Sequence, residues 1–147
     1  MSFETAQSAK AAVLNGRFGT LATLDFETGG PFASLVNYCC FGKGYPVFLL
    51  SQLARHTKCL LADARASLLV AELPTSGDIL TGLRATIMGH VEMIAPEAVA
   101  KAYLVKHPYA ETYVGFGDFA FYLLVPQTIH VVGGFGRIHT FKADEVF

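Results

Sequence analysis

Short apolar segments that alternate with glycine- and proline-rich turns are the feature that most restricts the fold of this chain. Such segments are typical of β-strands, and turn signals between them indicate neighbouring antiparallel strands. A sheet with so few helices to cover it avoids exposed edges best by closing on itself. We therefore predict a mainly β fold, an antiparallel β-barrel of six to seven strands, with strands at Arg17–Leu24, Phe32–Cys40, Val47–Leu50, Ser67–Ala71, Arg84–Ile94, Phe119–Val125 and Thr128–Val132.

Three peripheral helices are expected around this barrel. The first covers Ser2–Asn15 and stops at Gly16, the second covers His56–Ala62, and the third covers Glu97–Lys106 after Pro96. No linker, low-complexity tract or internal repeat divides the chain, so residues 1–147 are predicted to form a single domain.

The composition restricts the environment and the partners. Apolar residues make up 52% of the chain and charged residues only 16%, more apolar surface than one small domain can hide, which predicts a homodimer. A net charge of -1 offers no basic field for nucleic acid. No apolar run is long enough to cross a membrane and no signal peptide opens the chain, so we expect a cytoplasmic protein without membrane partners.

A basic cluster at the start of the second expected helix is the main candidate for a binding site. Arg55, His56 and Lys58 lie within four positions, where cationic side chains and free backbone N–H groups can converge on one anion. The alternative is a solvated helix start with no ligand, and the cluster taken alone leaves both open.

Other chemistry finds no support in the sequence. The three cysteines have no CxxC spacing and the five histidines have no metal-ligand spacing, so no metal site is predicted. The segment Gly133–Gly136 lacks the spacing of a dinucleotide loop, and no GxSxG motif is present.

Several segments together resemble one family over roughly residues 14–139. They are GTLATLDFETGGPFASLVNY, the triplet Ala54-Arg55-His56, DARASLLV at 63–70, GHVEMI at 89–94 and Arg137-Ile138-His139. In this order they resemble the FMN-binding split barrels of the pyridoxamine 5'-phosphate oxidase superfamily. The spacing from Ser51 through His56 and Thr57 to Leu60 is closest to an uncharacterised flavin-binding branch and to haem-utilisation relatives.

The resemblance implies a cofactor site. Backbone groups of Leu35 to Asn37 would meet the flavin ring, and the basic cluster would hold the phosphate. Arg137 and His139 would lie on the substrate side. The cofactor-binding residues that this implies are Ser34, Leu35, Val36, Asn37, Ser51, Arg55, His56, Thr57 and Lys58.

Departures from the oxidase pattern argue against true pyridoxamine phosphate oxidase activity. Ser34 replaces an arginine, His56 a lysine, and Val132 a tryptophan. The resemblance then implies an FMN-binding protein, a flavin-dependent oxidoreductase acting on an unidentified small molecule. Two alternatives stay open: a haem-binding or haem-utilisation protein on the same barrel, with a histidine as iron ligand, and a dimeric barrel without cofactor.

Overall fold

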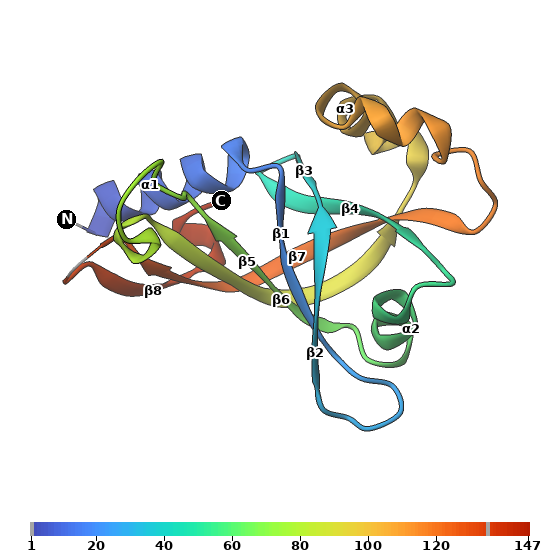
Figure 1. Cartoon of the computed structure of the whole chain (residues 1–147), viewed down its shortest axis with the longest axis horizontal. Helices are drawn as coiled ribbons and strands as arrows, with labels where there is room; N and C mark the ends of the chain where they lie inside the picture. The colour runs from blue at the N-terminus through green and yellow to red at the C-terminus, as the bar shows by residue number, and fades with distance from the viewer. Residues whose placement is uncertain (1, 135) are drawn as a thin grey trace.

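The computed structural model describes residues 2–134 and 136–147, which form one eight-stranded antiparallel sheet with three α-helices (Figure 1). The strands are β1 (Phe18–Leu24), β2 (Pro31–Asn37), β3 (Cys39–Phe41), β4 (Tyr45–Ser51), β5 (Arg65–Ala71), β6 (Arg84–Ile94), β7 (Phe119–Val132) and β8 (Ile138–Lys142). The helices are α1 (Ser2–Asn15), α2 (Arg55–Ala62) and α3 (Pro96–Lys106), with short 3₁₀ turns at Ile79–Thr81, Pro108–Thr112 and Ala143–Glu145.

The strand order is β2-β1-β5-β6-β7-β4-β3, and β8 adds to β7. One edge of β7 carries two partners, since β4 pairs with residues 119–123 and β8 with residues 128–132. Helix α1 and the C-terminus lie at one end of the molecule, and α2 and α3 at the other (Figure 1).

Two apolar cores fill the fold. The larger one lies between α1 and the sheet and includes Val13, Leu21, Phe48, Leu68 and Ile129. The smaller one packs α3 against β3, β4 and β7 through residues such as Tyr103. Because alternate side chains of a strand point to opposite faces, β4 serves both cores, and its residues 46–50 are all buried.

A single residue, Tyr38, carries the chain from β2 at one edge of the sheet to β3 at the other. Its ring is fully buried, and its hydroxyl donates a hydrogen bond of 2.6 Å to the carbonyl of Val13. Its own carbonyl lies 2.7 Å from His107 Nε2. This residue therefore ties α1, the sheet edges and the end of α3 together.

A β-bulge interrupts the pairing of β6 with β7 between Met88 and Gly89. At Gly89 the strands approach so closely that an added Cβ atom would lie 2.0 Å from the carbonyl oxygen of Val125. The bulge lets β7 pass Pro126, which has no N–H to donate, and continue as one strand.

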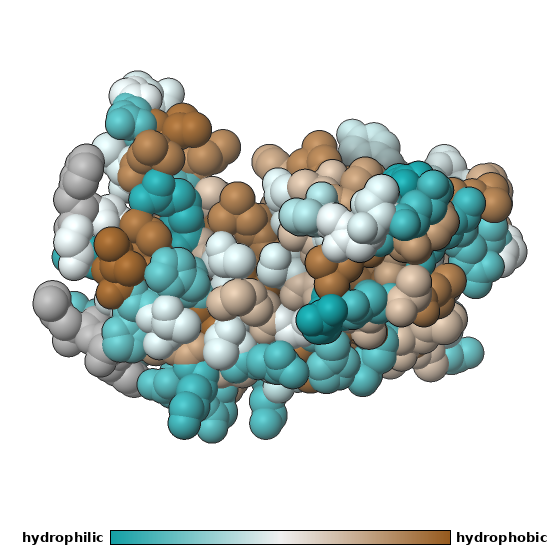
Figure 2. All heavy atoms as spheres, turned by 90° about the horizontal axis from the view of Figure 1, so that it is seen from below, coloured by the Kyte–Doolittle hydropathy of each residue, from teal (hydrophilic) through white to brown (hydrophobic). Residues whose placement is uncertain are grey.

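No described helix covers the outward face of β2, β1, β5 and β6. Register places Phe18, Leu35, Leu69 and Met88 on this face, and Leu35 is 75% exposed. A shallow cavity of about 330 Å³ lies on it, lined by residues that include Ala22, Pro31, Ala66 and Met88. Seen from below, the molecule shows hydrophobic patches between polar side chains and a notch between two lobes (Figure 2).

The structure confirms the antiparallel split-barrel class but differs in its details. The described residues form eight strands, because Tyr38 divides the segment expected as one strand, and the tail after Arg137 pairs as β8. The two segments expected between Phe119 and Val132 are one strand, owing to the bulge. The sheet curls into a half-barrel, and no pairing joins its edge strands β2 and β3 within the described chain.

Candidate functional site

A groove of about 210 Å³ lies where β2, β4, the start of α2 and the end of α3 meet. One wall carries aromatic side chains, from Tyr103, Tyr113 and Phe119. The remaining lining residues are Leu35, Val36, Asn37, Leu49, Leu50, Ser51, Ala54 and His56.

The groove brings together five of the nine predicted cofactor-binding residues, namely Leu35, Val36, Asn37, Ser51 and His56. Two others, Ser34 and Thr57, carry buried hydroxyl groups for which the described residues provide no hydrogen-bond partner. Lys58 is exposed to solvent. Buried polar groups of this kind usually have a partner, so these hydroxyls are available to a ligand that reaches them.

His56 differs from the cation that the phosphate prediction requires. It is half-buried and lines the groove, and its Nε2 atom is buried without a hydrogen-bond partner in the described part of the chain. Burial lowers the pKa of its imidazole below the usual value, so the ring is neutral at neutral pH. A neutral imidazole is the form that binds a metal ion.

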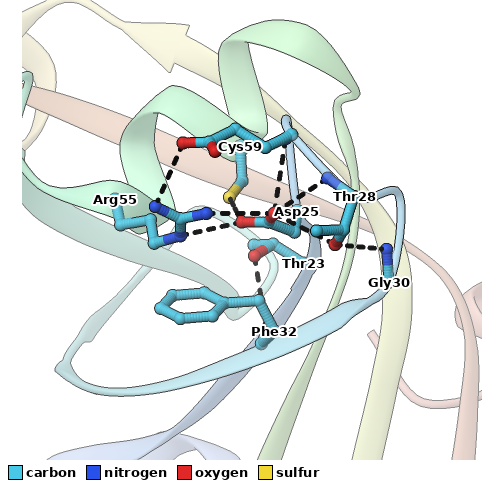
Figure 3. A network of polar contacts seen from close by, with 8 residues as sticks. Thr23, Asp25, Thr28, Gly30, Phe32, Arg55 and Cys59 are labelled. Carbon is cyan, nitrogen blue, oxygen red and sulfur yellow. Dashed lines mark hydrogen bonds and ion pairs between the residues drawn. The ribbon is translucent and has the colours of Figure 1, made fainter.

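Arg55 is not among the residues that line the groove, and its side chain points toward Asp25 in the loop between β1 and β2 (Figure 3). Its Nε and Nη2 atoms donate hydrogen bonds of 2.8 and 3.0 Å to the two carboxylate oxygens of Asp25. Nη1 lies 3.5 Å from Glu27 Oε1. The guanidinium carbon lies 5.0 Å from the ring centre of Phe26 and 5.8 Å from that of Phe32.

Asp25 is the centre of this network. Its side chain is 5% exposed and accepts further hydrogen bonds from the backbone N–H groups of Glu27 and Thr28 and from the Thr28 hydroxyl. The Cys59 thiol lies 3.8 Å from Asp25 Oδ1 (Figure 3). The hydrogen bond from Arg55 is the main cause that lowers the pKa of Asp25 to about 2, so the carboxylate is ionised at neutral pH.

Ser51 joins the groove to the segment that precedes β7. Its hydroxyl donates a 2.7 Å hydrogen bond to Asp118 and accepts one from the backbone N–H of Leu53. The role of Ser51 in the structure is therefore to hold the end of β4 against that segment.

The predicted substrate-side residues, Arg137 and His139, lie elsewhere. Both are exposed, and His139, on β8, packs its ring 4.2 Å from that of Phe141. Strand β8 pairs with residues 128–132 of β7, at the end of the molecule away from α2 (Figure 1). Phe119, which lines the groove, is the first residue of β7. One copy of the chain therefore does not bring these two residues to the groove.

Sequence reasoning missed Arg84, at the start of β6. Its Nε atom is buried, and the described residues offer it no hydrogen-bond partner. Register places it beside Ala71 and Val132, on the outward face of the sheet. Only the strand register shows that Arg84 lies on this face, so the sequence alone gave no signal for it.

Within residues 2–134 and 136–147, no group of three or more metal-binding side chains comes together. None of the helices described there is both long and apolar enough to span a membrane.

Three comparisons place this architecture among known proteins. The family model described as CREG, beta-barrel matches residues 2–147. The chain is 41% identical over 127 residues to the chloroplastic non-canonical haem oxygenase HOZ of Arabidopsis thaliana, covering 83% of this chain and 38% of that protein.

Solved structures share the fold of this chain. A haem-binding protein from Mycobacterium smegmatis is 32% identical, with a TM-score of 0.88, over 97% of this chain and 59% of that one. A Clostridium acetobutylicum protein of the pyridoxine phosphate oxidase family is 13% identical, with a TM-score of 0.75 and full coverage of both chains, a likeness of fold alone. The chain thus spans 38% of the length of the plant relative and 59% of that of the mycobacterial one.

Proposed function

The chain belongs to the CREG β-barrel family, and we propose that it binds haem in the groove between β2, β4 and α2. The observation that supports this most is that two relatives above 30% identity, from a plant and a bacterium, are both named for haem. This favours the haem alternative of the sequence analysis over the flavin-dependent oxidoreductase.

The residues of the groove fit haem in two respects. His56 offers a neutral imidazole whose Nε2 has no hydrogen-bond partner among the described residues, and histidine holds haem iron in many proteins. Tyr103, Tyr113 and Phe119 provide an aromatic wall against which a flat macrocycle can pack. When bound, haem supplies an iron centre able to bind small ligands, while these side chains hold and orient it.

The FMN phosphate finds a poorer fit. Arg55, the first residue of α2, is already paired with two carboxylates, and Ser34 stands where the oxidases carry an arginine. The exposed Lys58 is the remaining cation of the cluster. A phosphate placed here would meet Asp25 and Glu27 as like charges.

The groove is too small to enclose haem by itself. Its volume of about 210 Å³ lies below the roughly 300 to 1,000 Å³ of ordinary ligand sites. Leu35 joins the groove to the uncovered outward face, where Phe18 and Leu69 are also exposed. We therefore propose that a second copy of the chain covers this face and completes the site.

Haem binding is tested by titrating the purified chain with haemin and recording the visible spectrum. The wild-type chain should give a saturable, shifted haem band, and His56→Ala should change that band and weaken binding at least about tenfold, the loss of about 1.4 kcal/mol.

His139→Ala is the matched control, because His139 is an exposed histidine on β8, which lies neither in the groove nor on the uncovered face of β2, β1, β5 and β6. It should bind haemin like the wild-type chain. Equal spectra for all three proteins would remove His56 from the site. Tight FMN binding without haemin binding would refute the haem proposal and favour the flavin-dependent oxidoreductase.

We expect dimerisation to depend on the uncovered face. Sedimentation equilibrium at micromolar concentration should give about twice the chain mass, and Leu35→Glu should shift the chain toward monomer because it places a charge amid apolar side chains. Leu61→Glu is the control, since Leu61 is similarly exposed but lies on α2. A monomeric wild-type chain would contradict the proposal.

A further inference from the structure

The start of α2 has the properties of an anion-binding helix terminus. Its cap residue, Ala54, makes no side-chain hydrogen bond to the first turn, so the cap itself gives the backbone N–H groups there no acceptor. Arg55 adds a full positive charge at the first helical position. Such a terminus beside a groove would attract a phosphate.

The loop between β1 and β2 cancels this attraction. Asp25 engages two donor atoms of the Arg55 guanidinium (Figure 3). Glu27 Oε1 lies 3.5 Å from the third, Nη1. The flanking rings of Phe26 and Phe32 restrict the guanidinium further. The charges of Arg55, Asp25 and Glu27 sum to -1, so this cluster as a whole repels a phosphate.

Asp25 is itself fixed without help from Arg55. The N–H groups of Glu27 and Thr28 and the Thr28 hydroxyl all donate to its Oδ2 atom, so the carboxylate is preorganised by its own loop. A phosphate could therefore recruit Arg55 only by breaking two charge-assisted hydrogen bonds.

The consequence is visible in the groove lining. Ala54 and His56 line the groove, whereas Arg55, between them in sequence, does not. His56 is neutral at neutral pH, so neither residue gives the groove a cation.

We propose that Asp25 is a specificity-determining residue, which holds Arg55 in a closed ion-pair cluster and so prevents the groove from selecting a phosphate-bearing cofactor such as FMN. This inference rests on the proposed function in taking the groove as the cofactor site, and it adds how that site discriminates between cofactor classes.

The test compares FMN with riboflavin, which differ only by the phosphate. Flavin fluorescence titrations give Kd for both ligands. The riboflavin Kd divided by the FMN Kd, called the FMN ratio below, isolates the contribution of the phosphate. The wild-type chain should bind the two within about threefold of each other. Asp25→Asn keeps an oxygen acceptor for the loop but cannot neutralise Arg55, so FMN should gain at least about tenfold over riboflavin.

Two variants keep the test specific. Asp25→Asn combined with Arg55→Ala should return the ratio to the wild-type value, because the freed guanidinium is gone. Asp63→Asn releases Arg65 from a similar ion pair of 2.7 Å, neither residue of which lines the groove, and should leave the ratio unchanged.

If Asp25→Asn does not fold, as judged by circular dichroism, Glu27→Gln replaces it, because Glu27 is 62% exposed and bound only at the edge of the cluster. It should raise the ratio about threefold. A wild-type preference for FMN of tenfold or more, or no rise in a folded variant, overturns the inference.

Haemin titration of the same proteins separates the two proposals. Wild-type haemin binding with an unchanged FMN ratio in Asp25→Asn would refute the role of Asp25 and leave the haem proposal standing. A raised FMN ratio in Asp25→Asn without any haemin binding would support the role of Asp25 and refute the haem proposal.

Discussion

Gly89→Ala should destabilise the folded chain by about 3 kcal/mol or more, among the largest effects of any single added methyl group. The new Cβ atom would lie 2.0 Å from the Val125 carbonyl oxygen and 3.1 Å from the Cα atom of Pro126, both backbone atoms that cannot rotate away. Overpacking of this kind typically costs about 1–3 kcal/mol, and more where the backbone must move. Urea unfolding followed by circular dichroism would measure the loss.

Gly115→Ala is the control for this substitution. Gly115 is exposed, its φ angle is not positive, and no atom of the described residues lies within 4 Å of an added Cβ atom. Alanine there should be neutral or stabilise the chain by up to about 1 kcal/mol, by restricting the unfolded state. Equal midpoints for the two variants would show that the contact between β6 and β7 is looser than the structure has it.

Tyr38→Ala should cost about 3–5 kcal/mol, the usual loss for a fully buried aromatic side chain. Tyr38→Phe should cost less, about 1–3 kcal/mol, because the ring stays in place and the Val13 carbonyl exchanges its 2.6 Å hydrogen bond for the weaker 3.6 Å contact from the Cys40 thiol. Urea unfolding of both variants would separate the contribution of the ring to the free energy of unfolding from that of the hydroxyl.

Tyr109→Ala provides the comparison, since Tyr109 is 85% exposed and should tolerate the change within about 0.5 kcal/mol. If Tyr38→Ala were as mild, the crossing between the sheet edges would not depend on its buried side chain.

Sequence pattern predicted the elements that local chemistry determines. The bounds of α1 were predicted from its apolar face and Gly16, and α3 from Pro96 and the following alanine-rich run. The break at Tyr38 was not predicted, because Val36, Cys39 and Cys40 around it continue an apolar run and only the tertiary positions of β2 and β3 require the break. The continuous β7 depends on a bulge in pairing with β6, which no local signal in β7 reveals.

The candidate site was likewise predictable from the sequence only in part. The approach of β2 to the start of α2 followed from the family resemblance, and the structure brings five of the nine predicted residues to one groove. The role of Arg55 could not be read from the basic cluster, because its partner Asp25 lies 30 positions earlier, in a loop whose sequence indicates only a turn. Whether a cation is free or paired is a tertiary property.

The place of β4 in the sheet has a consequence for synthesis on the ribosome. Its neighbour on one side, β3, emerges just before it, but its other partner is residues 119–123 of β7. At about 5–20 residues per second, several seconds pass between the synthesis of Ser51 and that of Phe119. Throughout that interval a nascent strand with five consecutive residues destined for burial has an unpaired edge, which makes it a natural target for a holding chaperone.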